Sequence, residues 1–235
     1  MLSKMAIADV QRCRWHMLPD RLALDREAAS RILAAAGRAI AARGQFHIVL
    51  SGGETPRGAY RRLREAHEPW SSWHVYFGDE RCLPPGDSQR NSRMAAEAWL
   101  EHVPIPAPQR HAIPAELGAV AAARAYAQTL RAVGEFDLVL LGLGDDGHTA
   151  SLFPGGEWAS AADSPDVLAV VDAPKPHSQR VSLSAARLAR AREVVFLVAG
   201  ESKRHALDDW RAGRDIPARA IAPASGVDVL VATRS

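Results

Sequence analysis

Short runs of apolar residues recur along the chain, separated by longer segments that mix apolar and polar positions. The runs are FHIVLS (46–51), WHVYFGD (73–79), FDLVLLG (136–142), VLAVVDA (167–173), EVVFLVAG (193–200) and VDVLVAT (227–233). Most of them are nearly continuous rather than alternating. That pattern is typical of strands that are buried on both faces of a largely parallel sheet.

Helical periodicity fills several of the intervening segments. It is clearest over 20–43, where one apolar stripe precedes a glycine, Gly44, that is placed to end the helix. Segments 94–101, 119–132 and 202–211 also predict helices. Strands that alternate with helices predict an α/β fold: an open, doubly wound, mostly parallel sheet with helices on both faces, Rossmann-like in kind.

The chain reads as one domain, residues 1–235. It has no Gly/Ser linker, internal repeat or low-complexity tract, and the proline-rich stretch 103–114 predicts an ordered extended connection. A composition of 47% hydrophobic and 24% charged residues is that of an ordinary globular protein, whose core forms without disulfides. The net charge of +2 gives little long-range attraction for nucleic acid.

Targeting and redox signals are weak. The first 18 residues lack a continuous apolar segment, so we expect no signal peptide. No apolar run approaches the roughly 20 residues of a membrane span, so no membrane partner is expected. Cys13 and Cys82 form no CxxC pair, which favours a reduced protein in the cytoplasm.

In open α/β sheets, ligands bind where the carboxyl ends of the strands lead into loops. The first such loop is LSGGETPRGAY, in which Ser51, Gly52 and Gly53 follow the strand and Thr55 can cap the next helix. Glycines and a helix start together make a site for phosphate. A tight turn with an ordinary cap explains the segment equally well, and Glu54 would disfavour a bound anion.

The second loop is FGDERCLPPGDSQRN, in which Asp79, Glu80 and Arg81 come directly after a buried strand. Arg81 could hold a carboxylate, a phosphate or a developing oxyanion. A local salt bridge or strand cap is the favoured interpretation of this segment taken alone. Cys82, beside it, is expected to be inert rather than nucleophilic.

The third loop, LGLGDDGHTASLFPG, sets Asp145, Asp146 and His148 within four positions. A calcium loop would need alternating oxygen ligands and a twelfth-position glutamate, and zinc would need a further His or Cys. Asp146 can instead orient the imidazole of His148 so that it accepts a proton from water. A polar turn with a capping Asp remains the alternative, and Asp145 is expected to be solvated.

Two later basic residues stand at comparable places. Arg180 begins a short alternating segment, and Lys203 lies just past a strand end where a helix opens. Either can bind phosphate together with the dipole of a helix. Taken singly, each is typical of a solvated surface charge.

Together these segments resemble the 6-phosphogluconolactonase family, which provides the second enzyme of the oxidative pentose phosphate pathway. The likeness spans nearly the whole chain, and the stretch from Gly142 to Pro154 is its most specific part. It also includes LSGGETP, FGDERCLPPGDSQRN, the segment around Arg180, and AGESK. Glu54, where a small or polar residue is more usual, and the loosely similar segment WRAGRDIPARAIAP depart from the family pattern.

The resemblance implies a fold shared with glucosamine-6-phosphate deaminase and the sugar-phosphate isomerases. It implies hydrolysis of 6-phosphoglucono-1,5-lactone to 6-phosphogluconate, with no metal or organic cofactor. The implied phosphate ligands are Ser51, Gly52, Gly53, Thr55, Arg180 and Lys203. The implied catalytic residues are His148 as base, Asp146 as its partner and Arg81 at the lactone end, with Asp79 contacting substrate.

Two other functions are weighed against lactone hydrolysis. The deaminases share the turn DGH but carry a Glu five residues after the histidine, where this chain has Phe153. A non-catalytic sugar-phosphate sensor would need a DNA-binding helix-turn-helix, whereas the first 40 or so residues hold one clear helix. A sugar-phosphate lactone is therefore the expected partner, with a monomer or small homo-oligomer as the expected assembly.

Overall fold

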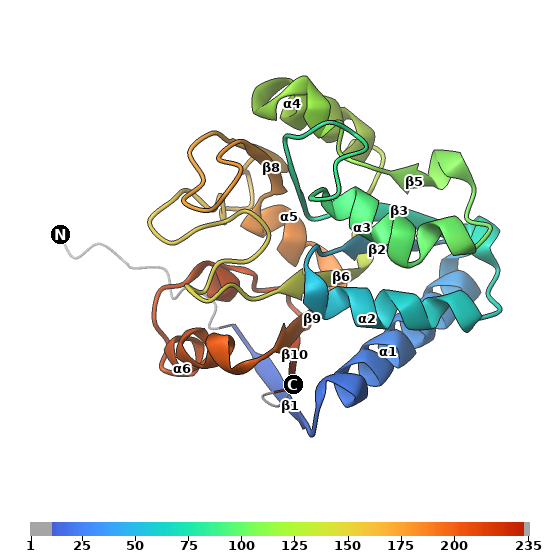
Figure 1. The fold of residues 1–235 in the computed structure, drawn as a ribbon, viewed down its shortest axis with the longest axis horizontal. Coiled ribbons are helices and arrows are strands. Elements are labelled where there is room, and N and C mark those ends of the chain that lie inside the picture. Colours follow the sequence, from blue (N-terminus) through green and yellow to red (C-terminus); the bar gives the residue numbers. More distant parts are fainter. Residues whose placement is uncertain (1–10, 233–235) are drawn as a thin grey trace.

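The computed structural model describes residues 11–232. Most of the segment in which no signal peptide is expected, and both ends of the expected domain, lie outside these residues. The helices are α1 (Arg21–Arg43), α2 (Glu54–Arg62), α3 (Asn91–Ala98), α4 (Ala119–Leu130), α5 (Ala185–Ala189) and α6 (Arg204–Arg211). They surround a central sheet (Figure 1).

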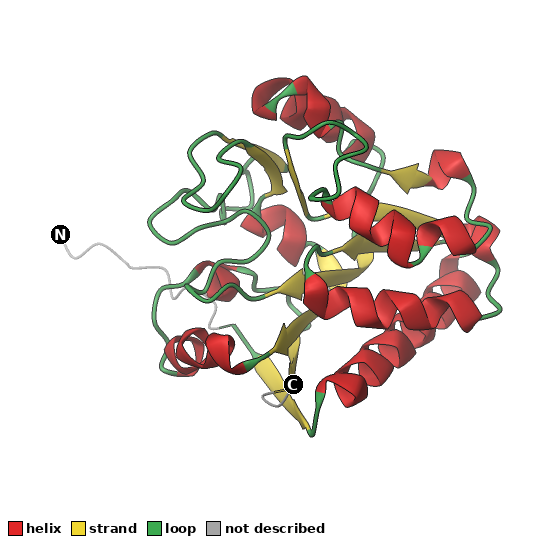
Figure 2. Cartoon of the chain, viewed as in Figure 1, coloured by secondary structure: helices red, strands yellow, loops and turns green. Residues whose placement is uncertain are grey.

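The central sheet has seven strands in the order β1-β10-β9-β6-β2-β3-β5, and every pair is parallel. Its strands are β1 (Cys13–Leu18), β2 (Phe46–Leu50), β3 (Trp73–Phe77), β5 (Arg110–His111), β6 (Phe136–Gly142), β9 (Ala191–Ala199) and β10 (Val227–Ala232). Strand β6 is buried from Phe136 to Leu141, as its continuous apolar run predicts. The predicted α/β fold with a mostly parallel sheet is confirmed (Figure 2).

A second, antiparallel sheet was not predicted. It has three strands, β4 (Asp79–Arg81), β8 (Arg180–Leu183) and β7 (Val167–Val170), in the order β4-β8-β7. The run 167–173 therefore does not belong to the parallel sheet. The run 73–79 divides at Gly78, whose N–H donates to Leu50 in the large sheet and whose carbonyl accepts from Leu183 in the small one.

Helix boundaries follow local capping. Helix α1 begins where the Asp20 side chain accepts from the N–H of Ala23 at 2.7 Å, and it ends at Gly44 with φ +76°. Helix α3 begins at Asn91, earlier than predicted. A 3-10 turn, η6 (Glu201–Lys203), replaces the predicted start of α6. The edge strand β1 was missed because it is only half buried and lacks a continuous apolar run.

Three histidines lie in a row near the amino ends of β2, β3 and β5. The rings of His47 and His74 stack with centroids 4.8 Å apart, and His74 Nδ1 lies 3.3 Å from His111 Nε2. Burial lowers the pKa of all three imidazoles; that of His111 falls to about 4, with His74 and His47 adding to the effect. The folded protein therefore favours the neutral form of this histidine row.

We expect the free energy of unfolding to fall as pH drops from about 6.5 to about 4, because the unfolded histidines take up protons first. Chemical denaturation at a series of pH values measures it. Carboxylates also titrate at the acid end of this window, so His111→Asn is the comparison: its slope against pH should be shallower. An unchanged slope in that variant would contradict the assignment.

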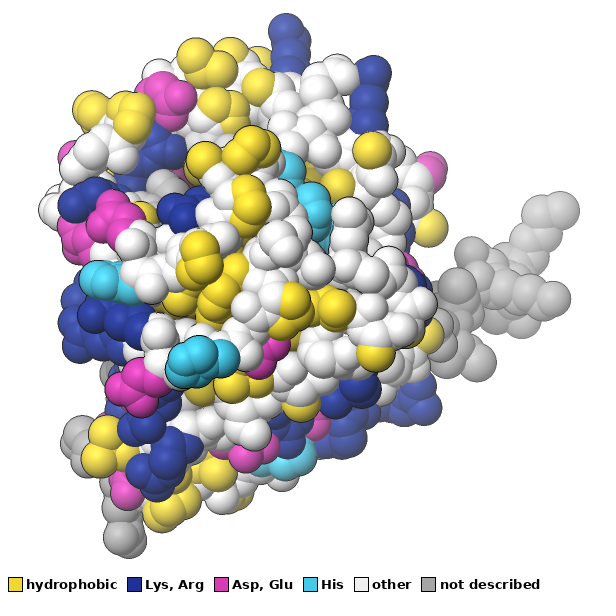
Figure 3. Space-filling model, turned by 90° about the vertical axis from the view of Figure 1, so that its right-hand side faces the viewer, with side chains coloured by type: hydrophobic (Ala, Val, Ile, Leu, Met, Phe, Trp, Pro, Cys, Tyr) yellow, Lys and Arg dark blue, Asp and Glu magenta, His cyan; other side chains and the backbone are white. Residues whose placement is uncertain are grey.

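The surface agrees with the weak net charge. On the face drawn in Figure 3, Lys and Arg side chains lie in separate groups with Asp and Glu among them. That face carries no continuous basic stripe of the kind that follows a nucleic-acid backbone. Within residues 11–232, no helix is both long and apolar enough to cross a membrane.

Candidate active site

A cavity of about 410 Å³ lies where the loops after β2, β6 and β9 meet the small sheet. Parallel strands end at the same edge of a sheet, so loops far apart in sequence converge there. Nine of the ten predicted site residues line this cavity: Ser51, Gly52, Gly53, Thr55, Asp79, Arg81, His148, Arg180 and Lys203. The tenth, Asp146, lies behind His148.

The amino end of α2 forms one wall. Gly53 is the residue before the helix, with φ +97° and ψ 173°, a conformation that glycine adopts readily and other residues do not. The helix therefore starts at Glu54, and the prediction that Thr55 caps it is wrong. No side chain caps this end, so the N–H groups of the first turn face the cavity side without a capping oxygen.

Neighbouring residues hold this loop in place. The Tyr60 hydroxyl donates to the Ser51 carbonyl at 2.9 Å and accepts from the Ser51 N–H at 3.1 Å. The backbone of Ser51 is thus occupied, and its hydroxyl donates to the Gly52 carbonyl at 3.2 Å. Arg21 donates to the carbonyls of Glu54 and Thr55. The Glu54 side chain also lines the cavity, but it is largely exposed and pairs with Arg57 at 2.9 Å, which offsets its negative charge.

Two glycines in the wall permit close packing of functional side chains. A Cβ on Gly52 would lie 1.9 Å from Asn91 Oδ1, and a Cβ on Gly144 would lie 2.0 Å from His148 Nδ1. Either contact is far inside van der Waals distance. These glycines are therefore required by side chains that press against their Cα atoms.

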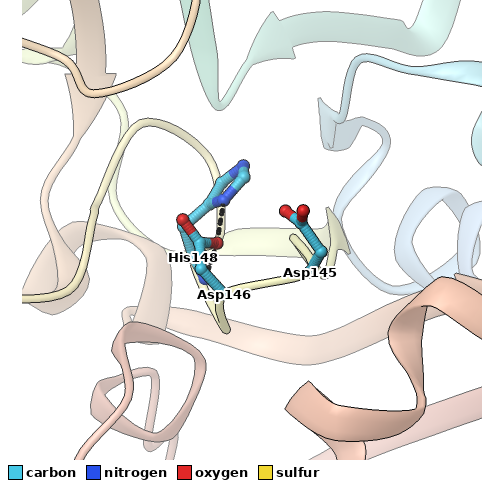
Figure 4. Close-up of side chains that lie close together, drawn as sticks. All are labelled: Asp145, Asp146 and His148. Carbon is cyan, nitrogen blue, oxygen red and sulfur yellow. Dashed lines mark hydrogen bonds and ion pairs between the residues drawn. The ribbon is translucent and has the colours of Figure 1, made fainter.

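His148 and Asp146 form the predicted pair. His148 Nδ1 lies 2.5 Å from Asp146 Oδ1, and the same oxygen accepts from the His148 N–H at 3.1 Å (Figure 4). Burial opposes ionisation of Asp146, but the hydrogen bonds from His148 outweigh it and lower the pKa of the carboxyl. A carboxylate at Nδ1 fixes the tautomer with its proton there, which leaves Nε2 as the acceptor.

Asp145 is more than half exposed, as expected, but it is paired: Lys175 Nζ lies 3.0 Å from its Oδ1. Carboxylate and ring atoms of Asp145, Asp146 and His148 come within 4.8 Å of one another, close enough to raise the question of a metal ion. Lys175 and the His148 N–H groups already engage these carboxylates. Ion pairing accounts for the cluster.

A buried polar network beside the cavity joins the small sheet to α3 and to the loop after β6. Asp79 accepts from Ser151 Oγ at 2.7 Å and from Asn91 Nδ2 at 2.9 Å. Arg180 Nη1 lies 3.5 Å from the same Ser151 hydroxyl, and its other nitrogens donate to the carbonyls of Pro176 and His177. Arg180 is only 6% exposed, so the solvated surface charge expected of it alone is wrong.

Sequence reasoning missed Asn91, Ser151 and Arg21 as residues of this site. Asn91 and Ser151 fall inside segments already singled out, FGDERCLPPGDSQRN and HTASL, so their position was visible although their contacts were not. Nothing in the sequence indicated that Arg21 belongs to the site, because an arginine in the first turn of a long amphipathic helix is an ordinary surface residue.

The local salt bridge expected of the segment FGDERCLPPGDSQRN forms between Glu80 and Arg90, at 3.5 Å, whereas Arg81 forms no ion pair within residues 11–232. Its guanidinium lines the cavity and donates to the Gln89 carbonyl, while its buried Nε has no hydrogen-bond partner in the described chain. The guanidinium thus retains donors for an oxygen of a ligand. Beside it, burial raises the pKa of the Cys82 thiol, which is typical of an inert cysteine.

Phe153 packs on the predicted base. Its ring centroid lies 4.9 Å from that of His148 and 5.5 Å from the Arg180 guanidinium. The side chain is 6% exposed. An apolar ring therefore occupies the place where a deaminase would carry a carboxylate.

The fold and the cavity define an α/β protein with a cavity at the carboxyl ends of its parallel strands, lined by basic side chains and by a histidine that is paired with a carboxylate. The family described as glucosamine-6-phosphate isomerases/6-phosphogluconolactonase matches residues 19–230. The chain belongs to this family.

Its relatives are consistent with that assignment. A 6-phosphogluconolactonase of Nostoc sp. is 40% identical over 201 residues, which cover 81% of this chain and 82% of that protein. One of Mycobacterium tuberculosis is 39% identical, covering 85% and 86%. The crystal structure of 6-phosphogluconolactonase from Thermotoga maritima superposes with a TM-score of 0.86 at 26% identity, covering 94% of this chain and 100% of that one.

Proposed function

We propose that this protein hydrolyses 6-phosphoglucono-1,5-lactone to 6-phosphogluconate in the oxidative pentose phosphate pathway. The observation that carries the proposal is the cavity, which is lined by His148, with Asp146 behind it, and also by the amino end of α2 and the cations Arg180 and Lys203. The names of relatives that are about 40% identical over most of both chains support it.

Phosphate binding is the first step of the proposed mechanism. The uncapped amino end of α2, with Ser51, Gly52, Gly53 and Thr55, offers N–H and hydroxyl donors and the positive end of a helix dipole. Arg180 and Lys203 add two cations to the same cavity. Holding the phosphate there uses binding energy remote from the reacting carbon to orient the lactone.

Hydrolysis follows from the His148–Asp146 pair. His148 Nε2 accepts a proton from water, and that water attacks C1 of the lactone while Asp146 stabilises the imidazolium. Arg81, which lines the cavity, stabilises the oxyanion of the tetrahedral intermediate. His148 then returns the proton to the ring oxygen as the C1–O bond breaks. Asp79, fixed by Asn91 and Ser151, contacts the sugar hydroxyls.

The rest of the proposed context is simple. We propose that residues 1–235 act as one domain, without metal or organic cofactor or nucleic acid, as a monomer or small homo-oligomer. The free thiols of Cys13 and Cys82 fit a reducing compartment, so the cytoplasm is the proposed location.

A coupled assay tests the function. Freshly prepared lactone is mixed with the protein, and 6-phosphogluconate dehydrogenase and NADP report product as NADPH after spontaneous opening is subtracted. We expect strong acceleration. Glucosamine-6-phosphate offered in parallel should release no ammonia, because Phe153 stands where the deaminases carry Glu. No acceleration, or release of ammonia, would overturn the proposal in favour of a sensor or a deaminase.

A further inference from the structure

Lys175 is a charged residue next to the active site that the proposed mechanism does not use. It lies in the loop 171–179, which connects β7 and β8 of the small sheet. The turn that carries His148 follows β6 of the large sheet. Lys175 Nζ lies 3.0 Å from Asp145 Oδ1 and 3.8 Å from Asp146 Oδ2. One ammonium group therefore spans both carboxylates of the turn.

The loop that carries Lys175 is itself held at several points. The carbonyls of Pro176 and His177 accept from Arg180, and His177 Nε2 lies 2.6 Å from Gln89 Oε1. Cys82 N–H donates to the Gln179 carbonyl at 3.0 Å. These contacts fix the backbone from which the lysine side chain reaches, so the position of its charge is set by the fold.

Two carboxylates beside one imidazole would by themselves favour its protonated form. Asp146 accepts directly from the ring of His148, and Asp145 has an oxygen within 4.8 Å of a ring nitrogen. A protonated imidazole cannot act as a base. Lys175 offsets part of this negative charge, because its ammonium group bonds to Asp145 Oδ1 at 3.0 Å and lies 3.8 Å from the second oxygen of Asp146.

We propose that Lys175 is a positioning residue that favours the proton-accepting form of His148, and that Asp145 anchors the lysine at 3.0 Å while opposing its effect on the imidazole. The two charges of the Lys175–Asp145 ion pair have opposing effects: the lysine disfavours protonation of His148, and the aspartate favours it. The two residues therefore act in opposite directions on the same imidazole. The kinetic part of this inference rests on the proposed function, whereas the effect on His148 protonation does not.

Other charged groups face the same region and are unchanged in the comparison. Those lining the cavity come from α1, α2, the small sheet and η6: Arg21, Glu54, Asp79, Arg81, Arg180 and Lys203. Behind the turn, the segment of Ile216 and Ala218 touches Gly147 and carries Arg219, whose guanidinium donates to the carbonyls of Gly213 and Arg214. Their electrostatic effect on His148 is therefore the same in every variant.

The test compares Lys175→Met, Asp145→Asn and the double variant with the unchanged protein. Both side chains are partly exposed, with 34% and 57% accessibility, so the substitutions leave the core intact, which thermal melting checks. The proton NMR signal of the His148 ring, assigned by its loss in His148→Gln, is followed against pH. The acid limb of kcat/KM for the lactone is measured on the same samples.

Because Lys175→Met removes a positive charge near the imidazole and Asp145→Asn removes a negative one, we expect the NMR pH profiles of the two single variants to move in opposite directions from that of the unchanged protein, toward higher pH in the first and lower pH in the second. The double variant should return close to the unchanged protein. Identical pH profiles in all samples, or shifts of the same sign in both single variants, would overturn the inference. NMR shifts without matching kinetic shifts would support the opposing effects of the two charges and overturn His148 as the catalytic base.

Discussion

Replacing His148 by Gln should lower lactone turnover by roughly 10²- to 10⁴-fold, the range expected when a general base is removed. Glutamine fills a similar space and can still bond to Asp146, but it cannot take a proton from water. The phosphate contacts are untouched, so KM should change little. The coupled NADPH assay, corrected for spontaneous lactone opening, measures both constants.

Asp146→Asn is the matched comparison, because it keeps the shape of the pair and removes the charge that holds His148 in its acceptor tautomer. The turnover of this variant should also fall. Its thermal melting curve should match that of the unchanged protein, which shows that the fold is intact. Turnover of the His148→Gln protein close to that of the unchanged protein would rule out the imidazole as the base and would direct attention to Asp79.

Gly144→Ala should lower turnover by about 10²-fold, because the added methyl group collides with the base. The Cβ would lie 2.0 Å from His148 Nδ1, so the ring must move away from Asp146. The backbone N–H of Gly144 donates to the His148 carbonyl at 2.7 Å, which leaves the turn little freedom to adjust. KM should stay near its original value.

Gly142→Ala supplies the control two residues earlier on the same strand end. Its Cβ would meet only Ser51 Oγ at 3.5 Å, an ordinary contact, so turnover should be nearly unchanged. Equal losses of turnover in the two variants would contradict this explanation. They would show that any side chain at this strand end is harmful, whether or not it contacts His148. Both proteins are assayed at saturating lactone, with circular dichroism to confirm folding.

The parallel sheet could be predicted because its strands are buried on both faces, and burial leaves continuous apolar runs such as 136–142. The small sheet could not. Strand β7 is partly exposed and β4 has three residues, among them Asp79 and Glu80, which a run of apolar residues cannot reveal. Both of those acidic side chains are buried because hydrogen bonds satisfy them, and such partners emerge only in three dimensions.

The site was predictable for a related reason. Residues that follow parallel strands must meet at one edge of the sheet, so Ser51 and His148 come together although 97 positions separate their numbers (148 − 51). Residues that support the site from elsewhere had no such signature. Lys175 reaches Asp145 from a loop of the small sheet, and the sequence of the turn gave no reason to expect an ion pair at Asp145.

The pairing of β1 with β10 bears on how the chain reaches this structure. Cys13 pairs with Val227 and Leu18 with Ala232, so the first and last described strands lie side by side. During synthesis, β1 must wait for β10, which is its one neighbour among the described strands of the central sheet. Contacts of such long sequence separation form slowly, since closing the loop loses chain entropy before any contact is gained. Refolding should therefore show late completion at this edge, with β1 the last strand to gain protection from hydrogen exchange.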